Sequence, residues 1–169
     1  MIVVVMGVSG AGKTTVGRLI AKALGAPFLE GDAFHPAANV ETMRRGLPLG
    51  DADRAPWLAS IAEALGGYVA RGESAVLACS ALKRGYRDVL RAGAPDARFV
   101  YLKGAQAQIA ARLAERKGHY MPSTLLDSQF AALEEPVLDE GAIVADIADS
   151  PASIARFVVD ALVPIFGVS

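Results

Sequence analysis

The chain has 169 residues, of which 53% are hydrophobic and 21% charged, a composition that predicts a folded globular protein and excludes a disordered one. The formal net charge of −1 gives no basis for broad nucleic-acid binding. No apolar stretch reaches the roughly 18 residues that a membrane span requires, so we expect neither nucleic acid nor a membrane as a partner.

The predicted elements alternate between short apolar strands and longer helices. The first run, residues 2–6, lacks a basic flank and is typical of a buried strand, not a signal peptide. Further runs of this kind, as expected for parallel strands buried on both faces, lie at 27–30, 75–79, 98–102 and 142–146. Helices are expected at 13–24, 56–70, 83–91, 105–114 and 152–162. Pro56 suits the first turn of its helix. This alternation predicts a single α/β domain over residues 1–169, with a five-stranded parallel sheet flanked by helices in three layers.

Two long segments interrupt this alternation. Residues 30–54 are rich in Pro, Gly, Asp and Arg, and residues 116–136 are polar with one helical stretch. Long excursions of this kind in compact domains usually carry function. We expect both to lie over the carboxyl ends of the strands, where open parallel sheets bind their ligands.

The stretch GVSGAGKTT, residues 7–15, contains the pattern G-x-x-x-x-G-K-[ST] between an expected strand and an expected helix. Glycines allow successive backbone N–H groups to point at phosphate oxygens, and the following helix adds its positive end. Lys13 is expected to neutralise the β- and γ-phosphates, and the Thr14 hydroxyl to bind Mg²⁺. The alternative, an ordinary glycine-rich turn, matches this pattern by chance with a probability on the order of 1%. The expected nucleotide-binding residues of the loop are Gly7, Ser9, Gly10, Ala11, Gly12, Lys13, Thr14 and Thr15.

Other motifs narrow the class of nucleotide-binding protein. The chain has no Asn-Lys-x-Asp motif of the kind that reads guanine in signalling GTPases. The third expected strand ends in Cys79-Ser80, where an ATP-driven motor would carry an acid. Small kinases can instead use an acid at the end of the second strand, the place of Asp32, so we expect a kinase that uses ATP and Mg²⁺. The single cysteine, Cys79, cannot form an internal disulfide, which favours a cytoplasmic location.

Three further blocks carry a resemblance to a known family. They are GDAFHPAANVETMRRGLPLGDADRAPWL at 31–58, ACSALKRGYRDVL at 78–90 and RKGHYMPSTLLDSQFAALEEP at 116–136. With the phosphate loop they run collinearly with the gluconate kinase (gluconokinase) family, which the chain resembles as far as Pro136. The resemblance implies a P-loop kinase fold, transfer of the γ-phosphate of ATP to the 6-hydroxyl of D-gluconate, and a homodimer. It also implies an acceptor-binding excursion at about 31–57 and a mobile lid at about 116–136.

A small polyol with one carboxylate needs cationic groups for its carboxylate and polar groups that read its hydroxyls. The expected substrate-binding residues are Asp32, His35, Arg54, Ser80, Lys83, Arg84, Arg87 and Gln129. Asp32 is expected to orient or deprotonate the accepting hydroxyl, because phosphoryl transfer depends mainly on positioning and charge neutralisation. Several alternatives stay open: a turn aspartate for Asp32, a structural histidine for His35, and a solvated helix face for Lys83 and Arg87. A Trp in the first turn of a helix more often packs in the core than stacks on a ligand, so we expect Trp57 to be a core residue.

Arg112 and Arg116 lie four residues apart, so we expect them on one side of a helix that ends near Gly118. The resemblance implies that Arg112 contacts the adenine side and that Arg116 neutralises phosphate charge, with Gly118 as the breaking point of a moving segment. Two surface arginines are the alternative. Lys13, Asp32 and Arg116 form the expected catalytic set.

Two rival functions remain at this stage. A shikimate or nucleoside monophosphate kinase would share the phosphate loop and the lid but would carry different acceptor blocks. A nucleotide-binding module that has lost catalysis is the rival from another class.

Overall fold

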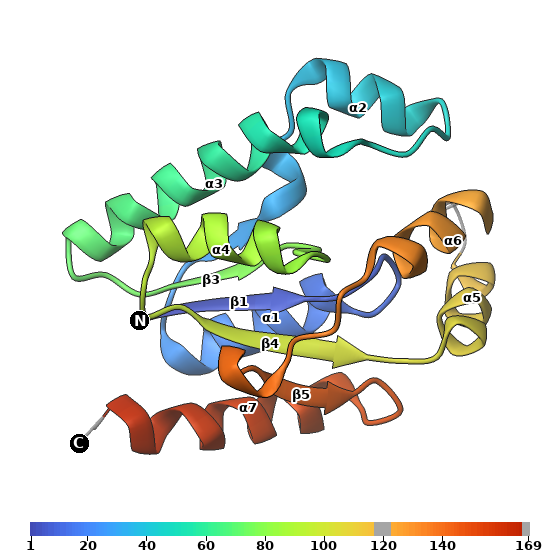
Figure 1. Ribbon diagram of the computed structural model, residues 1–169. Coiled ribbons are helices and arrows are strands. Elements are labelled where there is room, and N and C mark those ends of the chain that lie inside the picture. Colours follow the sequence, from blue (N-terminus) through green and yellow to red (C-terminus); the bar gives the residue numbers. More distant parts are fainter. Residues whose placement is uncertain (117–122, 167–169) are drawn as a thin grey trace.

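The computed structural model describes residues 1–116 and 123–166, which form an α/β fold around one parallel sheet (Figure 1). The strands are β1 Ile2–Met6, β2 Phe28–Glu30, β3 Ala75–Ala78, β4 Arg98–Lys103 and β5 Ile143–Asp146. Their order in the sheet is β2-β3-β1-β4-β5, and every neighbouring pair is parallel. The expected five-stranded parallel sheet is therefore confirmed, with β1 at its centre.

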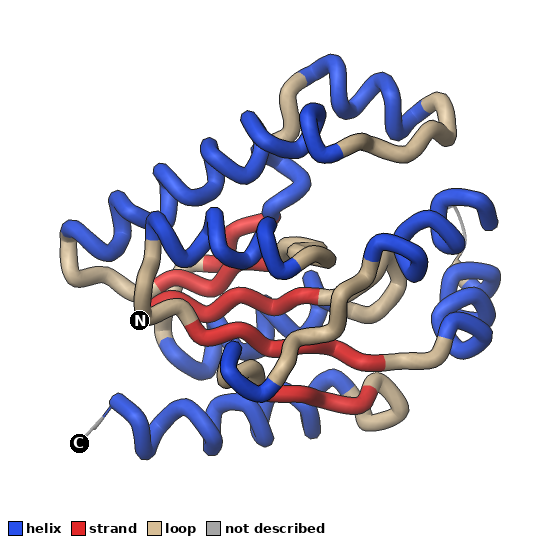
Figure 2. The backbone as a smooth tube through the Cα atoms, viewed as in Figure 1, coloured by secondary structure: helices blue, strands red, loops and turns tan. Residues whose placement is uncertain are grey.

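Helices cover both faces of this sheet (Figures 1 and 2). They are α1 Lys13–Leu24, α2 Ala37–Arg44, α3 Asp51–Ala70, α4 Arg84–Gly93, α5 Gln106–Glu115, α6 Ser123–Ala132 and α7 Pro151–Phe166. Two short 3-10 turns, η1 Gly31–Phe34 and η2 Leu138–Glu140, complete the described elements. α3 packs beside α4 on one face, and α1 packs beside α7 on the other. The three-layer arrangement is thus confirmed.

The sequence of β1 explains how one strand supports two cores. Successive side chains of a strand point to opposite faces. Val3 and Val5 accordingly join the core beneath α1 and α7, whereas Ile2, Val4 and Met6 join the core beneath α3 and α4. All five side chains are buried, which is why the run is continuously apolar.

The structure differs from the expected elements mainly between residues 31 and 57. α3 begins at Asp51, not at Pro56, because the Asp53 carboxylate accepts a hydrogen bond from the Gly50 N–H at 2.9 Å and caps an earlier start. Pro56 therefore lies inside the helix. α2, which has no predicted counterpart, follows directly after Pro36.

The carboxyl ends of the strands place the loops that matter. The loop of residues 7–12 leaves β1, η1 leaves β2, and residues 79–83 follow β3, all at the same edge of the sheet. None of the helices in the described part of the chain is long and apolar enough to cross a membrane.

Candidate active site

The loop between β1 and α1 has the backbone geometry of a phosphate cradle. Gly7, Gly10 and Gly12 all have positive φ, and Gly12, with a φ of 98°, is the N-cap of α1. At Gly10 a Cβ would lie 2.9 Å from Cγ of Leu113, so glycine is needed there for space as well as for conformation. The loop thus turns back on itself and ends at the positive end of α1.

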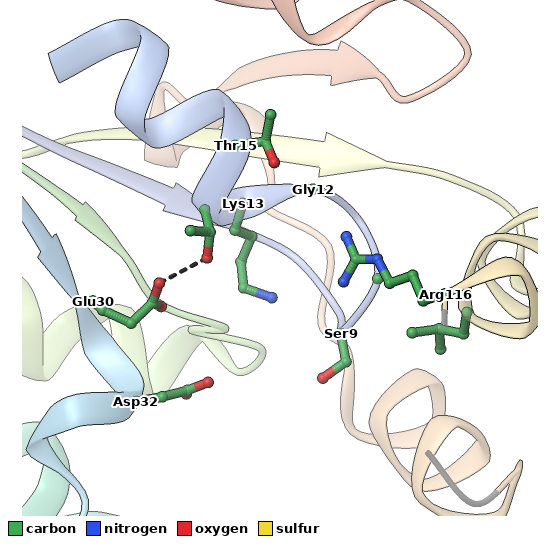
Figure 3. A pocket seen from close by; sticks show the side chains of 10 residues that line it. Ser9, Gly12, Lys13, Thr15, Glu30, Asp32 and Arg116 are labelled. Carbon is green, nitrogen blue, oxygen red and sulfur yellow. Dashed lines mark hydrogen bonds between the residues drawn. The ribbon is translucent and has the colours of Figure 1, made fainter. Parts of the chain in front are cut away.

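A cavity of about 360 Å³ lies against this loop. It is lined by Ser9, Gly10, Gly12, Lys13, Thr14, Thr15, Glu30, Asp32, Leu113 and Arg116. Figure 3 shows Lys13 extending into it from α1, Asp32 reaching it from η1 and Arg116 reaching it from the end of α5. The three residues expected to be catalytic therefore border one cavity.

Burial has the largest effect on the charge of Lys13 at this position. Its Nζ donates to the Val8 carbonyl at 3.0 Å. Burial lowers the pKa of Lys13 below its ordinary value of 10.5, and the Asp32 and Glu30 carboxylates act in the opposite direction. A desolvated amine at a helix N-terminus favours a phosphate as its partner.

Glu30 is a site residue that the sequence interpretation missed. Its Oε2 accepts a hydrogen bond of 2.7 Å from the Thr14 hydroxyl (Figure 3). Glu30 is the last residue of β2, two positions before Asp32, so the end of that strand was the signal that could have found it. The pair supplies a hydroxyl and a carboxylate oxygen beside Lys13, the hard oxygen donors that Mg²⁺ prefers.

Asp32 lies in η1 with its side chain 79% exposed and directed at the cavity. The backbone beneath it is firmly held. The Trp57 indole N–H donates to the Gly31 carbonyl at 2.8 Å, and a Cβ on Gly31 would lie only 2.5 Å from the Ala78 carbonyl. The carboxylate is therefore exposed on a rigid support, which suits contact with an incoming hydroxyl.

His35 belongs to that support. Its ring stacks on Trp57 with 4.1 Å between centroids, and its Nδ1 lies 3.3 Å from the Asn39 amide. The side chain is only 4% exposed, and burial lowers the pKa of His35, with Asp32 acting in the opposite direction. This packing favours the structural alternative for His35, and Trp57 is a core residue as expected.

A second cavity of about 280 Å³ lies between the start of α3, the start of α4 and α6. It is lined by Pro48, Leu49, Gly50, Asp51, Arg54, Lys83, Ser128 and Ala132. Two expected carboxylate-binding residues, Arg54 and Lys83, meet here. Lys83 pairs with Asp51 at 3.0 Å, and the Tyr86 hydroxyl donates to the same carboxylate. Arg54 lies over the Tyr86 ring and donates to the Leu49 carbonyl at 2.6 Å. Asp51 and Tyr86 were not predicted from the sequence as site residues.

Arg84 and Arg87 do not line either cavity. Arg84 pairs with Asp139 at 2.8 Å on the surface. Arg87 is fully buried, with Nε 2.5 Å from the Glu140 carboxylate, and it donates to the carbonyls of Ala81 and Leu82 at 3.0 and 3.3 Å. This packing does not support the expected substrate contact of Arg87, which stays a prediction, because the guanidinium is fully buried and paired with Glu140.

The hydrogen bonds from Arg87 to the Ala81 and Leu82 carbonyls also hold the loop after β3. Ala81 has a φ of 44°, a left-handed conformation that costs energy in a residue with a Cβ. Its neighbour Ser80 accepts a hydrogen bond from the Gly7 N–H at 3.3 Å. Arg87 thus holds a strained turn whose preceding residue touches the phosphate loop.

Gln129 also differs from its expected role. Its Oε1 accepts from the Ser9 N–H at 2.8 Å, and its Nε2 donates to the Ser9 hydroxyl at 3.1 Å. The side chain expected to bind substrate therefore contacts the phosphate loop.

The two arginines of α5 point to different places. Arg112 donates to the Ile147 carbonyl in the loop after β5, and Arg116, the C-cap of α5, borders the phosphate-loop cavity. The helix ends at Glu115, one residue beyond the expected range of 105–114 and short of the end near Gly118 that was expected for the arginine pair. Gly118 and the rest of residues 117–122 lie outside the described residues, so the lid over 116–136 stays a prediction.

A parallel sheet whose central strand runs into a glycine-rich phosphate loop and a lysine-led helix defines a P-loop nucleotide-binding protein. The family model described as an AAA domain matches residues 2–136. Beyond this class, the chain belongs to the gluconokinase family. It is 54% identical over 140 residues to the gluconokinase of Gluconobacter oxydans, covering 83% of this chain and 79% of the relative. It is 47% identical over 141 residues to the thermosensitive gluconokinase of Escherichia coli, covering 83% and 75%. The crystal structure of a gluconokinase from Sinorhizobium meliloti superposes with a TM-score of 0.88 at 47% identity, covering 96% of this chain and 91% of the other.

Proposed function

We propose that this protein transfers the γ-phosphoryl group of ATP to the 6-hydroxyl of D-gluconate, giving 6-phospho-D-gluconate. The observation that carries the proposal is that α6 lines one cavity and contacts a residue that lines the other. Ser128 lines the cavity that holds Arg54 and Lys83, and the next residue, Gln129, contacts Ser9 in the phosphate-loop cavity. A phosphate donor and a carboxylate-bearing acceptor can therefore bind side by side.

On the donor side, the loop N–H groups and the α1 N-terminus bind the phosphates, and Lys13 and Arg116 neutralise the charge that develops during transfer. Among residues 1–116 and 123–166, no group of three His, Cys, Asp or Glu residues could hold a metal ion alone. Thr14 and Glu30 nevertheless fit Mg²⁺, which commonly takes only one or two protein oxygens together with substrate phosphates. When bound, the ion adds neutralisation of phosphate charge.

On the acceptor side, Asp32 accepts a hydrogen bond from the attacking hydroxyl and directs it toward the phosphate. The exposed position of this carboxylate on a fixed backbone supports that role. Lys83 and Arg54 bind the substrate carboxylate, and Asp51 balances their charge when the acceptor is absent. Asp51 thereby prevents two neighbouring cations from repelling each other in the free enzyme.

A coupled assay that follows ADP release tests the proposal. Purified protein with ATP and Mg²⁺ is offered gluconate, shikimate and nucleoside monophosphates in parallel. We expect turnover with gluconate alone. Turnover with shikimate or a nucleotide would replace the proposed acceptor, and ATP binding without turnover on any of them would leave a non-catalytic module.

The proposal extends to the organisation of the protein. A homodimer, implied by the family resemblance, is tested by light scattering on the eluting protein. A cytoplasmic location and a single domain over residues 1–169 also stay predictions, the former resting on Cys79 as the chain's one cysteine, which is buried.

A further inference from the structure

The amide of Gln129 is hydrogen-bonded at both ends to one residue of the phosphate loop. Both its oxygen and its nitrogen bond to Ser9, which lies 120 positions away in the sequence. A side-chain amide that pairs at both ends with one residue fixes the orientation of that residue, because rotation of either group breaks one of the two bonds.

Ser9 lies next to the sharp turn of the phosphate loop and borders its cavity. Figure 3 shows it at the end of the loop away from α1, with its hydroxyl directed toward the side of the cavity on which Asp32 lies. The neighbouring Gly10 has a φ of 85°, so the chain turns sharply immediately after Ser9. The Ser9 N–H is one of the backbone donors of this loop, and Oε1 of Gln129 accepts its hydrogen bond.

The helix that carries Gln129 is itself anchored. Leu126 is 4% exposed in the core beneath α1 and α7. Asp127 accepts from the Gln106 amide of α5 at 2.5 Å. Past the end of α6, the Glu134 N–H donates to the Leu82 carbonyl at 2.8 Å. α6 is thus fixed to α5 and to the loop after β3, and it can hold Ser9 against displacement.

We propose that Gln129 is a positioning residue, which sets the acceptor-facing half of the phosphate loop through Ser9 and does not bind the substrate itself. The inference rests on the proposed phosphoryl transfer. It places the main effect of Gln129 on the transfer step, because the inner phosphates meet the opposite half of the loop, at Gly12, Lys13 and the N-terminus of α1.

The test uses Gln129→Met, which keeps the length of the side chain and removes both hydrogen bonds, with Gln129→Ala as the second variant. We expect kcat to fall roughly tenfold, the effect of two lost neutral hydrogen bonds. The dissociation constant of ADP, measured by calorimetry, and the KM for gluconate stay within about twofold of wild type, since neither contact is made by Gln129. Gln108→Ala is the matched control: within the described residues this glutamine of α5 makes no hydrogen bond to α6 or to the phosphate loop, so its loss should leave kcat unchanged.

A double-mutant cycle makes the assignment specific to Ser9. Ser9→Ala removes only the bond to Nε2, so it should lower kcat less than Gln129→Met does. The double variant should be no slower than Gln129→Met alone, because the contact is already lost. Fully multiplicative effects of the two substitutions would overturn the proposal.

Other outcomes would overturn it as well. A raised KM for gluconate with kcat unchanged would mean that Gln129 binds the substrate. A loss of ADP affinity as large as the loss of kcat would mean that Gln129 supports nucleotide binding. Unchanged kcat in Gln129→Met would remove the role altogether. If wild type fails on gluconate, the proposed function fails separately, and ATP hydrolysis without an acceptor then serves as the transfer readout for the same variants.

Discussion

The two halves of the active site are built in different ways. The phosphate half comprises mainly consecutive residues, 7–15, and presents backbone N–H groups, one lysine and three hydroxyls. The acceptor half draws on η1, the start of α3, the loop after β3 and α6, which are far apart in the sequence. Its geometry depends on side chains such as Arg87 and Glu140 that pair across 53 positions. A site built from consecutive backbone groups is specified locally, whereas a site built from paired side chains needs the whole fold.

This comparison is tested most strongly in the phosphate half. Lys13→Ala should lower kcat by several hundredfold, because removing one well-placed stabiliser of developing charge costs about 3–4 kcal/mol. Steady-state kinetics with ATP and gluconate measure the effect. Lys22→Ala, a change on the exposed part of the same helix, is the control and should retain full activity. Near-normal turnover of the Lys13 variant would contradict the phosphate-cradle assignment.

The next effect concerns the stability of the acceptor half. Glu140→Ala leaves the fully buried Arg87 guanidinium without its carboxylate, which should lower the free energy of unfolding by about 3 kcal/mol in denaturant titrations. Glu73→Ala, which breaks the exposed pair with Arg71, should cost less than about 1 kcal/mol. Equal losses in the two variants would mean that burial adds nothing to the Arg87–Glu140 pair.

The same pair predicts how stability depends on pH. The Arg87 hydrogen bonds lower the pKa of Glu140 from 4.5 to about 2. Because the folded pKa is below the unfolded one, the contribution of Glu140 is complete above about pH 4.5 and is lost as the pH falls toward 2. Unfolding midpoints of wild type and Glu140→Ala should therefore converge over that interval.

A third change separates donor from acceptor contacts. Asp32→Asn should lower kcat roughly a hundredfold, the usual range for a group that directs a proton in the transition state. The affinity for ADP should stay unchanged, because the proposed partner of Asp32 is the accepting hydroxyl. Asp96→Asn, an exposed aspartate in the turn before β4, is the control. Lost ADP affinity with an intact kcat would assign Asp32 to the nucleotide instead.

The smallest effect is expected at the rim of the acceptor cavity. Lys83→Met should raise the KM for gluconate roughly tenfold with little change in kcat, because it removes a ground-state contact with a carboxylate. Arg84→Met removes the neighbouring cation, which pairs with Asp139 on the surface, and should leave the KM unchanged. A raised KM for gluconate in Arg84→Met, with an unchanged KM in Lys83→Met, would assign the carboxylate contact to Arg84 instead.

The phosphate half could be predicted almost completely from the sequence. β1 and α1 have the expected bounds, because a run of buried apolar residues and a glycine-rich motif act over a few positions. The acceptor half could not. The helical spacing after residue 83 gave no sign that Arg87 turns inward, since its partner Glu140 follows β4, α5 and α6 in the chain. Glu30 was overlooked because Asp32, two positions later, already satisfied the expectation of an acid beyond β2.

The central position of β1 has a consequence for how the protein matures during synthesis. β1 is the first strand made, yet its neighbours are β3, which pairs Val4 with Leu77, and β4, which pairs Val4 with Phe99. Translation at roughly 5–20 residues per second means that the phosphate loop, though synthesised first, waits several seconds or longer for the strands that hold it. A ribosome-bound chain that ends before Lys103 should therefore carry the whole phosphate-binding motif and still lack a formed nucleotide site.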